Sequence, residues 1–226
     1  MKSAVSLLML NIKRFTYLIV LFGFSAASAG SYDDFFMAIK RDDSGTLINL
    51  LTRGFDPNTL NPAGETGLLL AVKEPSIKAA EALINWPKTD VELRNKQDES
   101  PLMMAAFKGL LDISQKLIAR DADVNKTGWT PLHYAATNGH LEIITLLLDS
   151  HAYIDAESPN GSTPLMMAAH YGTSEAVKLL LEAGADPLLK NQQGLSAIDF
   201  AQQAKRQDIA EIIAVAIRAR KPKGTW

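Results

Sequence analysis

Four histidines are the side chains in this sequence best suited to acid–base or metal chemistry: His133, His140, His151 and His170. No two of them have the His-Glu-x-x-His spacing of a zinc protease helix. The sequence also lacks a Gly-x-Ser-x-Gly nucleophile motif and a phosphate-binding loop. Catalysis needs acids, bases or nucleophiles that converge on one point. The sequence therefore predicts no catalytic residues and no enzyme activity.

Two methionine pairs, Met103-Met104 and Met166-Met167, raise the alternative of a copper(I) site, because thioether sulfur is a soft ligand. Methionine is also a flexible filler of hydrophobic cores, and both pairs fall at positions that stay apolar in the repeat described below. We therefore expect these side chains to pack in the core, and we predict neither a metal nor a cofactor. The sequence has no cysteine, which excludes thiolate zinc sites and disulfides.

The charge of the chain is unevenly distributed. Residues 1–30 contain three basic residues and no acidic residue, which leaves 20 basic against 25 acidic residues in the remainder. A surface that binds phosphates needs clustered positive charge. The composition therefore argues against a nucleic-acid partner.

The first 29 residues have the three parts of a secretory signal peptide. Lys13-Arg14 precede a ten-residue apolar run, Phe15–Phe24, and small residues follow up to Gly30. A helix needs about 20 apolar residues to cross a bilayer, so the run predicts a leader that is cleaved after Ala29. With no cysteine to accept a lipid, we expect a periplasmic or secreted product without stable membrane insertion. Two alternatives stay open: Met9 as the start codon, and an uncleaved leader that tethers a scaffold to the membrane.

A short element recurs along the rest of the chain at intervals of 34, 30, 33 and 33 residues. It reads Thr66-Gly-Leu, Ser100-Pro-Leu, Thr130-Pro-Leu, Thr163-Pro-Leu and Ser196-Ala-Ile. The stretch Thr130-Pro-Leu-His-Tyr-Ala-Ala-Thr-Asn-Gly-His140 and its continuation, Leu141–Leu148, resemble the signature of ankyrin repeats. That resemblance implies an all-α solenoid of helix-turn-helix repeats with β-hairpin-like fingers. It also implies that His133 ties neighbouring loops together.

The residues of the repeat favour the same elements on physical grounds. Thr130 or Thr163 can cap a first helix, and the following proline suits the first helical position. Paired alanines, such as Ala135-Ala136, let helices approach closely, and we expect Gly139 and Gly172 to end first helices with positive φ. Leu141, Ile144, Leu147 and Leu148 predict the buried stripe of a second helix.

These patterns predict a signal peptide at 1–29, an ankyrin-repeat domain at 30–217 and a basic tail at 218–226. The domain divides into about six repeats, counting the caps: 32–63, 64–97, 98–127, 128–160, 161–193 and 194–217. The last repeat has polar residues where inner repeats are apolar, which is typical of a solenoid cap. The 30-residue interval predicts a finger about three residues short before Thr130, which opens the groove there.

The resemblance implies that a partner contacts finger tips and the ends of first helices. Carried over to this sequence, it predicts a partner-binding set of Phe107, Lys108, Trp129, Thr137, Asn138, Ser162, His170 and Tyr171. Aromatic residues often dominate interface energetics, so we expect Phe107, Trp129 and Tyr171 to matter most. Packing between repeats is the alternative for Phe107 and Trp129.

The leading interpretation is a non-enzymatic, monomeric periplasmic protein that binds a protein partner of unknown identity in its concave groove. The resemblance also implies two narrower roles: an immunity protein that neutralises a toxin, and a protein that protects the envelope under stress. An enzyme with an unrecognised site and a membrane-tethered scaffold are the alternatives from other classes.

Overall fold

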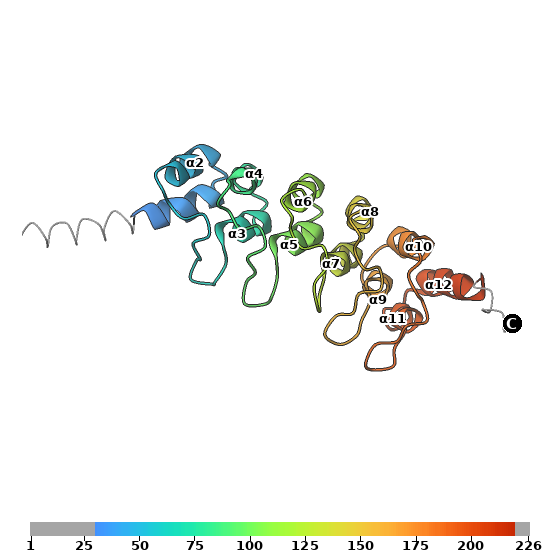
Figure 1. Ribbon diagram of the computed structural model, residues 1–226. Helices are drawn as coiled ribbons and strands as arrows, with labels where there is room; N and C mark the ends of the chain where they lie inside the picture. Colours follow the sequence, from blue (N-terminus) through green and yellow to red (C-terminus); the bar gives the residue numbers. More distant parts are fainter. Residues whose placement is uncertain (1–29, 220–226) are drawn as a thin grey trace, which may run out of the picture.

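The computed structural model describes residues 30–219, in which helices stack as antiparallel pairs into an elongated solenoid (Figure 1). The first pair consists of a helical segment at 30–40 and α2 (Ser44–Thr52). The predicted signal peptide and the tail beyond residue 219 lie outside the described residues. Arg218 of the predicted tail still belongs to the last helix, where it forms an ion pair with Glu211 at 2.7 Å.

Two rows of helices make up the stack. The inner row lies beside the loops and contains α3 (Gly67–Lys73), α5 (Pro101–Lys108), α7 (Pro131–Asn138), α9 (Pro164–His170) and α11 (Ala197–Gln203). The outer row continues from α2 with α4 (Ile77–Asn85), α6 (Leu111–Ile118), α8 (Leu141–Asp149), α10 (Ser174–Glu182) and α12 (Gln207–Ala219). The loops that join each outer helix to the next inner helix project from one side as fingers (Figure 1).

The predicted all-α solenoid is confirmed. Residues 30–219 contain no regular strand, and a single isolated bridge joins Leu60 to Thr66. The fingers are therefore turn-rich loops with hairpin shape. No helix within this range is both long and apolar enough to cross a membrane.

The inner helices begin at the residues that the repeat predicts, but they are capped in two ways. The side-chain oxygens of Thr66, Ser100 and Thr163 accept hydrogen bonds from the backbone three residues on, at 3.2, 3.3 and 3.4 Å. Thr130 differs, because its hydroxyl lies 2.9 Å from Nδ1 of His133. Thr130 is still the N-cap of α7, as predicted, and it forms a capping box with His133, whose Nδ1 accepts the backbone N–H of Thr130 at 3.2 Å.

The glycines after the inner helices follow the prediction at one position and depart from it at another. Gly139 ends α7 with φ of +70°, as expected. Gly172 has no left-handed conformation, and Tyr171 ends α9 instead. A Cβ added at Gly172 would lie 2.4 Å from the carbonyl oxygen of Ala136. Glycine is required at 172 by close backbone approach between repeats, which the sequence prediction missed.

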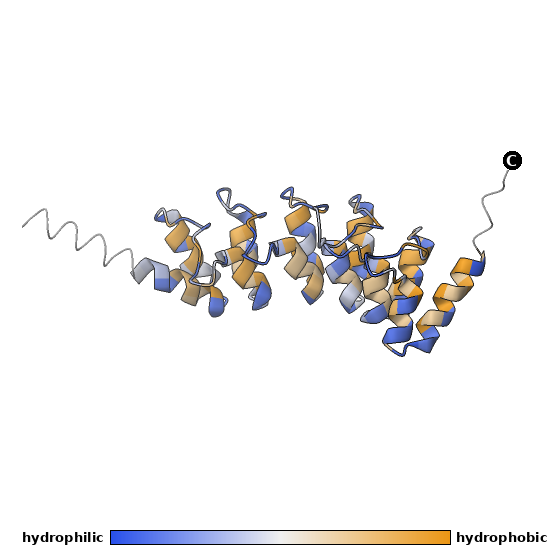
Figure 2. Ribbon diagram, turned by 90° about the horizontal axis from the view of Figure 1, so that it is seen from below, coloured by the Kyte–Doolittle hydropathy of each residue, from blue (hydrophilic) through white to orange (hydrophobic). Residues whose placement is uncertain are grey.

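One apolar core runs the length of the solenoid, and the helices carry the hydrophobic residues while the fingers are hydrophilic (Figure 2). Ala135 and Ala136 are fully buried between inner helices, as their size predicts. The stripe predicted for α8 needs correction. Its buried residues are Ile143, Ile144 and Leu147, whereas Leu141 is 38% exposed. The first turn of α8 leaves Leu141 outside the helix–helix contact.

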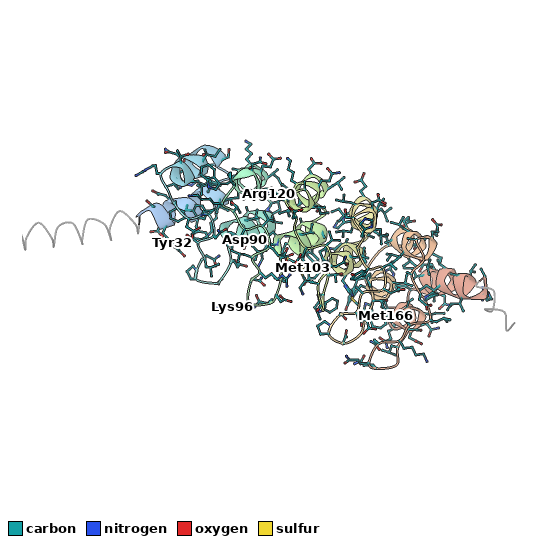
Figure 3. All side chains as sticks on the ribbon, viewed as in Figure 1. Tyr32, Asp90, Lys96, Met103, Arg120 and Met166 are labelled. Carbon is teal, nitrogen blue, oxygen red and sulfur yellow. The ribbon has the colours of Figure 1, made fainter. Side chains whose placement is uncertain are left out.

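The methionine pairs are core residues. Met103 and Met166 are 1% exposed, and the sulfur of each accepts a backbone N–H, from Ser100 and Thr163 respectively, at 3.4 Å (Figure 3). Met104 and Met167 are also buried. Their thioethers therefore satisfy backbone donors and fill space between inner helices, as expected of core methionines.

Polar side chains tie successive repeats together at the outer ends of the helices. Arg120, after α6, donates to the carbonyl oxygens of Ile84 and Thr89 around the end of α4 (Figure 3). The amide of Asn58 bridges to the next finger, accepting from the N–H of Asp90 and donating to the carbonyl of Lys88. These bonds satisfy backbone groups that helix ends and loops leave open.

Candidate protein-binding face

A hollow of about 530 Å³ lies on the inner row, where α3, α5 and α7 pass one another. We call it the inner groove; it is lined by Lys73, Glu74, Glu99, Met104, Phe107, Lys108 and Tyr134. Phe107 is 37% exposed, and its ring meets that of Tyr134 edge-on with centroids 6.0 Å apart. An apolar floor with charged residues around it is the usual make-up of a binding hollow.

The rim of the inner groove is held by polar contacts. Lys73 forms an ion pair with Glu65 at 2.5 Å, which raises the pKa of Lys73 and lowers that of Glu65. Glu99 accepts a hydrogen bond from the amide of Asn95 at 2.7 Å. Burial, together with the nearby charge of Glu99, raises the pKa of Tyr134 to about 12. The phenol therefore stays neutral at any physiological pH and presents a hydroxyl at the groove.

A second hollow, of about 520 Å³, lies between finger tips; we call it the finger gap. Its lining comes from four successive fingers: Gln97, Asp98, Lys126, Thr127, Gly128, Trp129, Glu157, Ser158, Pro159 and Gln192. The finger at its centre joins α6 to α7 and is the one shortened in the sequence. The gap lies where the 30-residue interval predicts an opening.

A lysine side chain closes the short finger, whereas backbone hydrogen bonds close the other fingers. In those fingers the carbonyls of Glu65, Glu99, Ser162 and Leu195 each accept a backbone N–H from four residues earlier, at 2.8 to 3.1 Å. In the short finger, Nζ of Lys126 donates instead to the carbonyls of Trp129 and Thr127, at 3.1 and 3.0 Å. The Lys126 side chain is only 5% exposed and forms an ion pair with Asp98 at 2.5 Å. The buried ammonium therefore fixes the backbone that carries Trp129.

His170 and Tyr171 lie further along the inner row, at the end of α9. Tyr171 is 61% exposed, and its ring centroid is 4.0 Å from that of His170. His170 in turn lies edge-on to Phe200 of α11, at 6.0 Å. Neither His170 nor Tyr171 lines the inner groove or the finger gap.

Three residues of the predicted set have structural partners. Ser162 is fully buried, and its carbonyl accepts a hydrogen bond from His133, so its assignment to the contact face is wrong. The amide of Asn138 donates to the carbonyl of Phe107 at 2.6 Å, and the hydroxyl of Thr137 donates to the carbonyl of His133. Phe107, Lys108 and Trp129 do line the two hollows, and their part in binding a partner stays a prediction.

Tyr134 was missed by sequence reasoning. It follows His133 in a position that Met104 and Met167 occupy in other repeats, and the sequence predicts those two residues to be core. The structure shows that this position borders the inner groove at Met104 and Tyr134. A phenol at a mainly apolar position was the available signal, because a half-buried tyrosine usually places its hydroxyl at a polar boundary.

The histidines do not gather into a site. Across residues 30–219, no three His, Asp or Glu side chains are grouped so that they could hold a metal ion. His133 is buried and bonded to Thr130 and Ser162, and His140 lies 3.1 Å from the carbonyl of Phe107. The role that the resemblance implies for His133, linking neighbouring loops, is what the structure shows.

Comparison with curated proteins shows similarity to parts of longer chains. The B-cell lymphoma 3 protein homolog of Mus musculus is 30% identical over 167 residues, which are 71% of this chain and 37% of that protein. The nuclear factor NF-kappa-B p105 subunit of Gallus gallus is 30% identical over 179 residues, 76% of this chain and 18% of that protein. The chain thus spans well under half the length of these relatives.

Solved structures match more of their own length. An ankyrin repeat domain from Acinetobacter baumannii is 28% identical with a TM-score of 0.71, covering 80% of this chain and 96% of that one. A chain from the complex of the Bdellovibrio bacteriovorus predatory endopeptidase Bd0816 with the immunity protein Bd3460 is also 28% identical. Its TM-score is 0.70, and the match covers 80% of this chain and 97% of that chain.

Family models agree with the repeat, the helix pairs and the finger geometry. Models of ankyrin repeats match residues 35–127, 68–158 and 151–201. The matched ranges together run through nearly all the described helices. The chain belongs to the ankyrin-repeat family of protein–protein interaction modules.

Proposed function

We propose that this chain is an exported, non-catalytic, monomeric protein that binds a protein partner through the inner groove and the finger gap. The observation that carries the proposal is the inner groove itself. It contains the exposed ring of Phe107 and the half-buried ring of Tyr134 beside the charged side chains of Lys73, Lys108 and Glu99. Rigid aromatic side chains in a hollow with a polar rim are typical of interface hot spots.

Export is part of this proposal. The three-part leader at residues 1–29 supports a mature protein that begins at Gly30 and acts in the periplasm or outside the cell. N-terminal sequencing of the protein recovered from a periplasmic extract should give Gly30 as the first residue. Recovery of the full-length chain in the membrane fraction would contradict export and favour the tethered scaffold.

Site-specific photocrosslinking tests which face binds. Benzophenone amino acids placed at Phe107 and at Trp129 should each give an adduct of the same added mass when the protein is expressed in its native envelope. Gln115 of α6 and Lys178 of α10 are matched controls, because both are exposed on the outer row. Equal adducts from Gln115 or Lys178, or none from Phe107 and Trp129, would overturn the proposed face.

A second, narrower candidate function is that of an immunity protein. It is supported by the similarity to a chain from the complex of an endopeptidase with an immunity protein, of which this chain spans 97%. Under this reading the partner is an exported enzyme of the same cell, which the solenoid blocks. Stress protection of envelope proteins, which the resemblance also implies, has no such structural counterpart here.

Inhibition measurements test the narrower role. The mature protein should inhibit a purified envelope endopeptidase of the cell that produces it, with one-to-one stoichiometry. The Phe107→Ala/Tyr134→Ala variant should inhibit the same enzyme much more weakly. Binding in the crosslinking assay without inhibition of any such enzyme would remove the immunity role and leave the binding proposal intact.

A further inference from the structure

We infer that the finger gap binds an arginine side chain of the protein partner, between Trp129 and Glu157. This deepens the proposed function and rests on it. The gap has about 520 Å³ and is lined from four fingers, which suits a long side chain at the tip of a partner loop. The 30-residue interval makes the gap particular to this place in the stack, because the neighbouring intervals are 33 or 34 residues.

The charges around the gap favour a cation. Two carboxylates line the gap, those of Asp98 and Glu157, and Lys126 is the one cation in its lining. Lys126 forms an ion pair with Asp98, and Arg94, which lies outside the lining, pairs with Asp98, Glu92 and Asp123. Negative charge is therefore in excess, and a cationic guest would complete the pairing.

The cations already present do not fill the gap. The Lys126 side chain is 5% exposed and directs its ammonium to carbonyls of its own finger and to Asp98. Glu157, by contrast, is exposed, and no ion pair in the described part of the chain uses it. Asp98 is 61% exposed despite its two cationic partners. The Glu157 carboxylate thus remains open to the gap, whereas the Lys126 ammonium is already bonded to Asp98 and to two carbonyls.

The apolar part of the lining favours arginine over lysine. Trp129 and Pro159 contribute apolar surface, and the ring of Trp129 is held edge-on to His133 at 5.2 Å. A guanidinium is planar and weakly hydrated, stacks on aromatic rings and pairs with carboxylates through two parallel hydrogen bonds. A lysine ammonium is compact and strongly hydrated, so it loses more on leaving water.

The test uses a small probe, so that it does not depend on finding the partner. Into the isotope-labelled mature protein we would titrate N-acetyl-argininamide, with the uncharged isostere N-acetyl-citrullinamide as the matched probe, and follow the indole N–H signal of Trp129. A saturable shift with the arginine probe is expected, at roughly millimolar affinity for so small a ligand. Glu157→Gln should weaken it about fivefold, in line with loss of a charge-assisted hydrogen bond. The control Glu175→Gln, an exposed acid of α10, should leave it unchanged.

Equal shifts with the citrulline probe, or an unchanged affinity in Glu157→Gln, would overturn the arginine assignment. The crosslinking assay separates this failure from failure of the proposed function. With the benzophenone at Phe107, the adduct should be lost on charge reversal by Glu157→Arg and kept on Glu175→Arg. An adduct that survives Glu157→Arg leaves the binding face standing and rejects the arginine. Absence of any adduct rejects the proposed function while the probe titration still decides the gap.

Discussion

The Nε2–H of His133 donates a hydrogen bond to the carbonyl oxygen of Ser162, 2.9 Å away in the next finger. The other ring nitrogen, Nδ1, accepts from the backbone N–H of Thr130 at 3.2 Å, which fixes the neutral tautomer. The imidazole is fully buried. Burial lowers the pKa of His133 to about 4, although the hydrogen bond to Ser162 acts in the opposite direction.

This buried histidine predicts a pH-dependent stability. In the unfolded chain His133 has an ordinary pKa of 6.5, so between pH 6.5 and about 4 the unfolded state binds a proton that the folded state does not. The free energy of unfolding should therefore fall as the pH drops through that window, by up to about 3 kcal/mol. Urea unfolding at several pH values between 7.5 and 4.5 measures it.

His133→Met is the matched control for this prediction, because methionine accepts the same backbone bond at Met103 and Met166 in neighbouring repeats. The variant lacks the titrating group, so its free energy of unfolding should vary less with pH across the same window. Parallel pH profiles for the two proteins would show that other groups cause the dependence.

The sequence was sufficient for the elements because each repeat carries local signals that agree. Cap, proline, paired alanines and glycine all predict the same helix pair, and five spaced copies fix the register. It was insufficient where contacts with a neighbouring repeat determine the conformation or burial of a residue. Glycine is needed at 172 because the carbonyl of Ala136 leaves no room for a Cβ, and Ser162 is buried beside His133 and Asn191. Which residues border a hollow depends on the spacing between stacked units, and a single repeat does not encode that spacing.

The candidate face was predictable in outline for a similar reason. Helix-end positions such as Phe107 and the short finger with Trp129 could be located by counting along the repeat. Tyr134 and the buried ammonium of Lys126 could not, because the first shares a position with core methionines and the second sits in a loop of irregular length. The features that are particular to this protein therefore lie mainly where its sequence departs from the repeat.

Removing the Phe107 ring should separate binding from folding. Phe107→Ala loses an edge-on contact with Tyr134, which should lower the free energy of unfolding by about 1 kcal/mol. Partner binding should weaken by tenfold or more, as expected for a hot-spot residue, with a loss of about 2 kcal/mol. Leu141→Ala is the control, because Leu141 is similarly exposed, at 38% against 37%, but begins an outer helix. Equal binding losses in both variants would argue against a specific role for the groove.

Lys126 should matter for the stability of the short finger more than a surface lysine does. Lys126→Met keeps the apolar stem but removes the donors to the carbonyls of Thr127 and Trp129. Loss of these hydrogen bonds should lower the free energy of unfolding by roughly 1–3 kcal/mol, and the near-ultraviolet circular dichroism of Trp129 should change. Lys96→Met, at the exposed tip of the neighbouring finger, should stay within about 0.5 kcal/mol of the parent. Similar small effects in both would mean that Lys126 is not needed to close the finger.

Substitution of Gly139 tests how closely one repeat packs against the next. Its φ of +70° already disfavours any side chain, and a Cβ there would lie 2.6 Å from Cγ2 of Thr173 at the start of α10. Gly194 has a comparable φ of +76° with nothing within 4 Å of an added Cβ. Gly194→Ala should therefore show the backbone cost alone, about 1 kcal/mol. Gly139→Ala should cost at least about 1 kcal/mol more, because Thr173 and α10 must move to admit the methyl group.

Chemical denaturation of the two variants measures the difference, and Gly139→Ala combined with Thr173→Ser should recover part of it by removing the methyl group at the contact. Equal losses for Gly139→Ala and Gly194→Ala would mean that the repeats yield at this contact without cost.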